Sequence, residues 1–527
     1  MFVSSRGFTL KTKDSVVTIY QEILVKPFGT ITRDFQFVES STREILEEIL
    51  EISPNYPAFT KKLCKRASSE SASDELVLLA IQHSSYLNFD ELKWKVLEAQ
   101  SDRISVRPHI LEMKAISEND WDTVIEATEA AIDQANSEWE TFLQLLHLYK
   151  IVSLNRFGSP LEERTQRRIE KAMDGNPALE QYSPSFYLNR TIRLRLEGDV
   201  SHAQSVCEKG LSQARNVDDR LSEIFFLWQK AELIGVYSFG PGTTEIAKQI
   251  LREAIEISDN INCKGCRAVI LELIQVMCHM RGEYSEAYEI SLEILKMLES
   301  IGKQDDVNMH NLSAICNEMG NGREALEWAN QALRIFDKQP FYRPVAYLDV
   351  AWSLINLGKL DEAEEQLNLA REYLYQSGYG STLAIEQMVS GLLERALGDY
   401  DSALTSLEKA WETNLRENRH NRATSCLVKL AETEVMAFKP TPDNIQDESA
   451  GIWLTRLEEY GEKMDLPGVI ALALFLKGEL RFKQGRLNEA KELDEKVHRM
   501  SELPGLAYLK DKAHPAVSSL KQERRRG

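Results

Sequence analysis

The sequence has little cysteine and histidine and no long uncharged apolar run. No stretch of the 527 residues approaches the run of about eighteen uncharged residues that a membrane span needs. The opening residues, MFVSSRGFTLKTKDSV, lack the apolar run of a signal peptide. Seven cysteines, an odd number without framework spacing, are typical of a reducing compartment. We therefore expect a cytoplasmic protein without membrane attachment.

Basic residues are also too few for a nucleic-acid-binding protein. The chain has 63 lysines and arginines against 82 acidic residues, a net charge of −19, which would repel a phosphate backbone. The compact basic runs are at residues 164–171, 190–195 and 521–526. Short runs of this kind are typical of solvated helix faces and chain ends. Nucleic acid is therefore excluded as the expected partner.

Motifs for catalysis or for a bound cofactor are missing as well. The phrase CKGC places Cys263 and Cys266 together, but a second CxxC is absent. If residues 264–280 form a helix, Cys263 and Cys278 lie roughly 20 Å apart at 1.5 Å per residue, too far to share a zinc ion. A redox role for Cys263 and Cys266 remains open, although the βαβ context of such motifs is lacking. We expect no metal, no cofactor and no enzymatic activity.

Phosphate-binding motifs are also missing from the sequence. The stretch SFGPGTTE lacks the Gly-Lys-Ser/Thr of a phosphate loop. Asp218 and Asp219 lack a third aspartate three residues on, since Ser222 stands there. They are expected to be loop acids near a helix start.

What the sequence does have is a recurring phrase around a glycine. It is visible in EGDVSHAQ, RGEYSEAY, LGKLDEAE, LGDYDSAL and QGRLNEAK. Each phrase indicates a helix that ends at glycine, a polar turn, and a second helix. An alanine follows the glycine by five residues every time, at Ala203, Ala247, Ala287, Ala325, Ala363, Ala403 and Ala490. The steps from Ala203 to Ala403 are 44, 40, 38, 38 and 40 residues, which establishes a period near 40.

The alanines have a steric explanation. Two antiparallel helices joined by a tight turn approach closely only where a small side chain lies at their crossing. Apolar residues four and seven positions later give each second helix one packing face. A single hairpin cannot bury both of its faces, so neighbours must stack. The sequence predicts an all-α solenoid, an α-α superhelix of about ten helical hairpins.

These phrases resemble the tetratricopeptide repeat, with glycine at the turn and a central alanine in the second helix. The usual repeat has about 34 residues, so this chain resembles a longer variant of the kind seen in kinesin light chain-type adaptors. The resemblance implies a protein-binding scaffold whose first helices line a concave groove. The solenoid is expected over residues 108–512, with an insertion at 439–451.

The ends are expected to differ from the solenoid. Residues 40–107 are predicted to form atypical helical hairpins. Residues 1–39 are rich in β-branched and aromatic residues on either side of KPFGT, and they could form a two-stranded β-hairpin. Residues 513–527 are predicted to be a basic disordered tail.

Counting back from each turn glycine gives the positions that the resemblance implies for the groove. They are Asn189, Ile192, Val236, Val276, Asn311, Asp349, Trp352, Ile355, Met388 and Leu392. This set is mainly apolar, which favours an amphipathic, mildly basic protein segment as partner. Two alternatives remain open: some of these residues pack against the neighbouring helix, or the chain associates with itself and its own terminus fills the groove.

Overall fold

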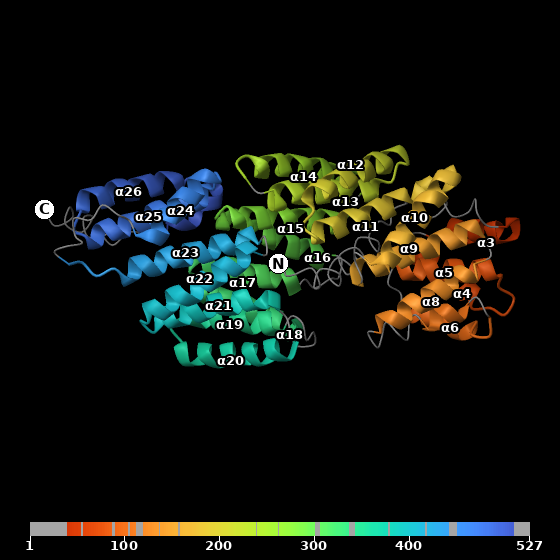
Figure 1. Cartoon of the computed structure of the whole chain (residues 1–527), viewed down its shortest axis with the longest axis horizontal. Coiled ribbons are helices and arrows are strands. Elements are labelled where there is room, and N and C mark those ends of the chain that lie inside the picture. The colour runs from red at the N-terminus through yellow and green to blue at the C-terminus, as the bar shows by residue number, and fades with distance from the viewer. Residues whose placement is uncertain are drawn as a thin grey trace. The chain divides into compact units, whose positions relative to one another are not determined.

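The computed structural model describes residues 39–510 with short gaps, and helices joined by turns make up most of it (Figure 1). The gaps are at residues 54–55, 87–89, 104–105, 112–119, 136, 156–158, 239, 262, 301–305, 337–342, 378–379, 417–418 and 442–450. The described residues contain no β-strand, and none of their helices is long and apolar enough to cross a membrane. The all-α prediction is confirmed. The predicted β-hairpin, most of the insertion and the predicted tail lie outside the described residues.

The chain divides into two compact units. Of the described residues, the amino-terminal unit comprises those within 39–233 and 250–267. The carboxy-terminal unit comprises those within 234–249 and 268–510. Each unit is described by itself below.

The amino-terminal unit consists of helices that begin at recognisable caps. The carboxylates of Asp199 and Asp219, for example, accept the backbone N–H groups of His202 and Ser222 at 3.2 and 3.1 Å. Asp219 therefore has the helix-start role expected for it. The helices are α3 (Ser40–Glu51), α4 (Tyr56–Ala67), α5 (Asp74–Tyr86), α6 (Asp90–Ala99), α8 (Trp121–Asp133), α9 (Glu138–Asn155), α10 (Pro160–Gly175), η3 (Pro177–Tyr182), α11 (Ser183–Leu196), α12 (Val200–Asn216) and α13 (Arg220–Glu232).

The helices that follow run from the yellow-green to the blue part of Figure 1. They are η4 (Leu233–Tyr237), α14 (Thr243–Asn260), α15 (Lys264–Met280), α16 (Tyr284–Glu299), α17 (Asp306–Met319), α18 (Gly322–Phe336), α19 (Arg343–Asn356), α20 (Leu360–Ser377), α21 (Gly380–Ala396), α22 (Tyr400–Arg416), α23 (His420–Ala437), α24 (Ile452–Lys463), α25 (Pro467–Lys483), α26 (Leu487–Met500) and η5 (Pro504–Lys510). Helices α14 and α15 each pass from one unit to the other.

The turn glycines adopt the conformation expected of helix stops. Gly398, between α21 and α22, has φ +87°, in the left-handed region that disfavours other residues. The following residue, Asp399, donates its N–H to the carbonyl of Glu394 at 3.0 Å, the bond that closes a Schellman turn. The other predicted turn glycines also have positive φ, namely Gly198, Gly242, Gly282, Gly320, Gly358 and Gly485.

The alanines lie where the two helices of a hairpin cross. All seven are at most 1% exposed: Ala203, Ala247, Ala287, Ala325, Ala363, Ala403 and Ala490. At the α21–α22 crossing, a Cβ on Gly391 would lie 3.0 Å from the carbonyl oxygen of Ala403, so the backbones approach closely there. The steric reading of the repeat is therefore confirmed.

The carboxy-terminal unit closes on itself, which the repeat pattern does not predict. Gly468, at the start of α25, donates its N–H to the carbonyl of Arg281 in the α15–α16 turn at 3.0 Å. Tyr508 of η5 donates its N–H to the Ser285 hydroxyl at 2.9 Å, and its ring lies 5.2 Å from the ring of Tyr284. One hydrophobic core extends from α15 to η5. The last helices of the unit therefore pack on its first hairpin.

Candidate functional site

The ten predicted groove residues fall into two groups by burial. Asn189 and Ile192, on α11 of the amino-terminal unit, are half-buried. The other eight belong to the carboxy-terminal unit and are at most 9% exposed: Val236, Val276, Asn311, Asp349, Trp352, Ile355, Met388 and Leu392. They lie on η4, α15, α17, α19 and α21.

The apolar members of the buried group include core residues. Trp352 is 5% exposed and belongs, with Ile355 and Met388, to the same hydrophobic core as residues of α23, α25 and η5. Met388 also contacts the hydroxyl of Ser425 on α23, with 3.9 Å between Sδ and Oγ. A side chain in such a position stabilises the unit by packing. Trp352 therefore presents almost no surface to a partner.

The polar members of the buried group are paired within the wall. The Asn311 amide donates to Oε1 of Gln275 at 3.2 Å. The Asp349 carboxylate pairs with Nδ1 of His310, on the neighbouring first helix α17. Because buried polar groups are costly to leave without partners, these contacts hold α15, α17 and α19 side by side.

A buried ion pair connects two helices that are far apart in sequence. Glu318, on α17, accepts a hydrogen bond from the Ser425 hydroxyl and lies 3.0 Å from Nζ of Lys429, both on α23. Glu318 is 4% exposed and Lys429 5%. Desolvation alone would lower the pKa of Lys429, but the carboxylates of Glu318 and Glu432 outweigh it and raise that pKa. In the carboxy-terminal unit, helix α23 thus contacts α17 through Glu318.

The amino-terminal unit keeps part of its first-helix surface accessible. Helices α9 and α11 pack against each other, and each has half-buried residues at positions i, i+1 and i+4. Those positions lie on one side of a helix. We call this surface the α9–α11 face, which comprises Leu143, Gln144, His147, Leu188, Asn189 and Ile192.

The two halves of the α9–α11 face occupy equivalent positions in consecutive repeats. Helices α9 and α11 begin 45 residues apart, at Glu138 and Ser183. The same offset of 45 relates Leu143 to Leu188 and His147 to Ile192. Equivalent positions of stacked repeats point to the same side of the array, so the face is continuous across the two helices.

Carboxylates neutralise the arginines that flank the face. Arg190 lies 3.0 Å from Glu170, and Arg193 lies 2.6 Å from Glu162 and 2.8 Å from Glu197. The Asn189 amide donates only to the Ser185 carbonyl of its own helix, at 2.9 Å. A ligand on the α9–α11 face would therefore contact apolar and amide groups and no net charge.

Three residues of this face, Leu143, Gln144 and His147, were not among the sequence predictions. The unit around them was too degenerate to be recognised by a turn glycine and a central alanine. A signal was nevertheless present, because EWETFLQLLHLYK aligns with SPSFYLNRTIRLR at the constant offset of 45 residues. Comparing helix starts, rather than turn phrases, would have found them.

One cluster in the described part of the chain has the composition of a metal site. Ligand atoms of Cys278, Glu283 and Glu286 lie within 4.8 Å of one another. The ammonium of Lys248 lies 3.6 Å from Glu283 and 3.9 Å from Glu286, and Arg281 lies 2.9 Å from Glu283, so two cations of the protein already balance the two carboxylates. Burial raises the pKa of Cys278, which disfavours the thiolate that a metal requires. The cluster therefore fits an ion-pair network better than a metal site.

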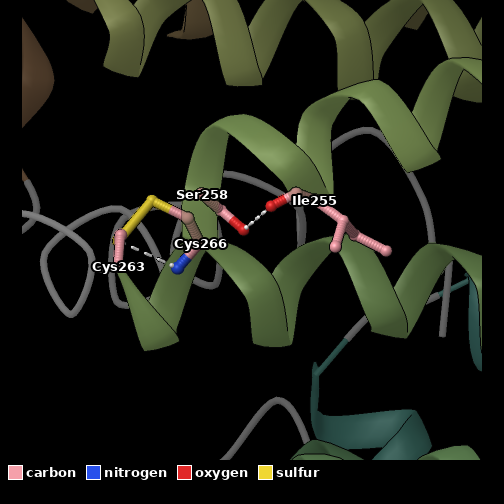
Figure 2. The surroundings of a disulfide bond; sticks show 4 residues. All are labelled: Ile255, Ser258, Cys263 and Cys266. Atoms are coloured by element: carbon pink, nitrogen blue, oxygen red, sulfur yellow. Dashed lines mark hydrogen bonds between the residues drawn. A yellow bond between two sulfur atoms is a disulfide. The ribbon is translucent and has the colours of Figure 1, made fainter. Parts of the chain in front are cut away.

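The cysteines of CKGC are not free thiols. Helix α15 covers residues 264–280 as predicted, so Cys263 and Cys278 lie at opposite ends of it. Cys263 and Cys266 are joined by a disulfide, with 5.3 Å between their Cα atoms (Figure 2). The first turn of a helix brings cysteines at this spacing into the range of a disulfide.

Comparisons with known proteins give only distant structural similarity. No family model and no curated protein matches this sequence. Among similar solved structures are a Rap protein complexed with competence and sporulation factor (12% identity, TM-score 0.41, 64% of this chain and 99% of that chain), yeast Tom70 (14%, 0.32, 86% and 97%) and NprR in complex with its cognate peptide NprX (13%, 0.36, 71% and 96%). With TM-scores this low, the assignment of the fold depends on the hairpins of the chain itself.

Those hairpins have the defining features of the repeat. A left-handed glycine ends the first helix, a buried alanine marks the crossing in the second, and successive hairpins stack. The resemblance to kinesin light chain-type adaptors in particular stays a prediction. The protein is an all-α helical repeat protein whose hairpins resemble the tetratricopeptide repeat.

Proposed function

We propose that this protein is a non-enzymatic scaffold that binds a protein segment on the α9–α11 face. The observation that supports this proposal is the difference in burial between the two units. In the carboxy-terminal unit the predicted groove residues are at most 9% exposed, whereas Asn189 and Ile192 are half-buried. A ligand can reach the second group without displacing a helix.

The face has the groups that a peptide needs. Leu188 and Ile192 offer apolar contact, and the amides of Gln144 and Asn189 can donate and accept hydrogen bonds. Apolar residues at i and i+4 on neighbouring helices suit the anchors of an amphipathic helix, and amides suit the main chain of an extended segment. Both modes fall within the proposed function.

We propose an amphipathic, mildly basic segment as the partner. The net charge of −19 attracts cationic ligands over distances of about a Debye length, about 8–10 Å at physiological salt. The arginines beside the face are paired with glutamates, so they do not cancel this attraction. The positive charge of the segment then contributes mainly to its association rate.

A second candidate function is self-occupation, and one observation favours it. Helix α17 is contacted by α23 of the same chain through Glu318, Ser425 and Lys429. In that unit the packing helices are internal ones, whereas the alternative that remained open from the sequence was a terminus of the chain. Residues 1–38 and 511–527 lie outside the described part. If residues 1–39 occupy the α9–α11 face, a chain beginning at Ser40 should bind peptides more tightly than the full chain.

Peptide selection against the full chain tests the proposed function. A displayed random library would be panned, and the affinity of the best peptide would be measured as a synthetic peptide by calorimetry. Ile192→Asp places a carboxylate in the apolar part of the face and should weaken binding at least tenfold, about 1.4 kcal/mol. Ile192→Val should preserve most of the affinity because it keeps the apolar surface.

Leu383→Asp is the matched control. Leu383 lies in the first turn of α21 and is 46% exposed. Its substitution adds the same charge at a position outside the α9–α11 face. It should leave the affinity unchanged. Equal affinities for wild type and Ile192→Asp, with circular dichroism showing that both are folded, would place the binding site elsewhere.

A further inference from the structure

The disulfide between Cys263 and Cys266 lies in the turn that joins α14 to α15. Cys263 immediately precedes α15, and Cys266 lies in its first turn. Figure 2 shows the pair beside Ser258 and Ile255 near the end of α14. Cys263 is 2% exposed and Cys266 is 1% exposed.

The turn does not need this disulfide to keep its shape. The Cys263 N–H donates to the Ser258 carbonyl at 2.8 Å, and the Arg267 N–H donates to the Cys263 carbonyl at 3.1 Å. The Arg267 guanidinium lies 2.7 Å from the Asp259 carboxylate. A disulfide stabilises mainly by closing a long loop in the unfolded chain, and this one joins residues only three apart. Its contribution to folding is therefore small.

The surroundings instead favour thiolate chemistry at Cys263. Its sulfur accepts the backbone N–H of Cys266 at 3.2 Å, at the positive end of the α15 dipole. Lys264 follows Cys263 directly in the chain, whereas the charge of Arg267 is balanced by Asp259. Helix N-termini and nearby cations stabilise a thiolate. Cys263 is thus the better nucleophile of the two, because it receives the N–H.

Four of the other cysteines are as buried as this pair but lie within helices and not at a helix start. Burial raises the pKa of Cys207, Cys316 and Cys426 to about 12 each, and it also raises the pKa of Cys278. Thiols with a raised pKa react slowly, since the thiolate is the reactive form. The contact of the Cys263 sulfur with a backbone N–H at a helix start, and not burial, therefore distinguishes the CKGC pair from these four residues.

We propose that Cys263 and Cys266 form a reversible redox site that exchanges with a low-molecular-weight disulfide such as glutathione disulfide. In oxidation, the Cys263 thiolate attacks one sulfur of glutathione disulfide, and the first glutathione leaves as a thiolate and takes up a proton. Cys266 then loses its proton and attacks the Cys263 sulfur, which releases the second glutathione. Two protein thiols are oxidised and one glutathione disulfide is reduced to two glutathiones.

Exchange requires a local opening of the α14–α15 turn, because neither sulfur is exposed. Reduction follows the same steps in reverse, with glutathione as the attacking thiol. Urea at a concentration that loosens the turn without unfolding the chain should therefore accelerate the exchange and leave its end point nearly unchanged.

The full-length protein would be equilibrated in buffers of graded glutathione and glutathione disulfide, acid-quenched, unfolded and alkylated with N-ethylmaleimide. Intact mass should show adducts on all seven cysteines in excess glutathione and a loss of two adducts in excess glutathione disulfide. Peptide mapping should assign that loss to Cys263 and Cys266. Cys266→Ser should trap glutathione on Cys263, and Cys263→Ser should trap at least tenfold less on Cys266.

Cys316→Ala is the control and should still lose two adducts in excess glutathione disulfide. Seven adducts on the wild type at every glutathione ratio would overturn the proposal, because the pair would then remain reduced. Loss of two adducts that persists even in excess glutathione would also overturn it, since the bond would be a permanent structural one. Both readouts use the wild-type chain, so they remain decisive if a variant does not fold.

Discussion

Lys429 keeps its charge in the interior of the carboxy-terminal unit because two carboxylates lie beside it. Glu318 is 3.0 Å away and Glu432 3.4 Å. A buried ion pair adds little to stability compared with a well-packed apolar pair, but removing one partner leaves an uncompensated charge. Residues 318 and 429 belong to hairpins well separated in the chain, so this pair connects helices that are distant in sequence.

Lys429→Met should therefore destabilise the unit by about 3–5 kcal/mol, since Glu318 would stay buried with only the Ser425 hydroxyl beside it. Urea unfolding followed by circular dichroism measures the loss. The double variant Glu318→Gln with Lys429→Met is the control and should lose less, because it removes both charges. A single variant as stable as wild type would mean that the carboxylate is hydrated.

The same residue predicts a dependence on pH. The folded-state pKa of Lys429 is raised above its ordinary value of 10.5. Its contribution to stability is therefore complete below about pH 10.5 and is lost as the pH rises through the raised pKa. The stability difference between wild type and Lys429→Met should shrink over that alkaline range.

At the scale of the element, each hairpin depends on a close helix crossing. Ala363, in α20, is 0% exposed and lies in the core shared with α19 and α21. The turn before it is set by Gly358, which has φ +72° and open space where a Cβ would lie. Substitutions at the two positions therefore have different physical effects.

Ala363→Trp should overpack the α19–α20 crossing and cost on the order of 1–3 kcal/mol or more. Hydrogen exchange should show lost protection in α19, α20 and the adjoining α21 before distant hairpins, because repeats contact mainly their neighbours. Gly358→Ala is the matched control, in which only backbone strain of about 1–2 kcal/mol is expected. A uniform loss of protection through the unit would indicate a single cooperative globule.

At the scale of the whole molecule, closure of the carboxy-terminal unit depends on backbone contact between two glycines. A Cβ on Gly468 would overlap the backbone of Gly282 and of Arg281. The start of α25 can therefore pack on the α15–α16 turn only where a side chain is missing. Contacts of η5 with Ser285 and Tyr284 extend the same closure.

Gly468→Val should separate α25 from the α15–α16 turn and increase the radius of gyration measured by small-angle X-ray scattering. Hydrogen exchange of the Gly468 region and of η5 should rise with it. Gly485→Ala, just after the other end of α25, is the control, because a Cβ there meets no atom within 4 Å and only the backbone strain of a positive φ is added. If Gly468→Val left scattering and exchange unchanged, the closure would have to be held by the side chains alone.

Local chemistry in the sequence determined the hairpins. A glycine that can adopt positive φ, followed five residues later by a small residue, specifies a turn and a crossing without distant partners. The bounds predicted for α15 and the burial of Ala287 and Ala403 agree with the structure for that reason. Cys263 and Cys278 cannot share a zinc ion because helix α15 separates them.

Only the tertiary structure decided which inward residues stay accessible. The curvature of a repeat array accumulates from small rotations at every hairpin, and a period of about 40 residues does not encode that sum. Trp352 and Asp349 therefore became interior residues when α23, α25 and η5 returned to the first hairpin of their unit, whereas Asn189 and Ile192 remained half-buried. The pairing of Glu318 with Lys429, which lie 111 residues apart, follows from this return and from no local pattern.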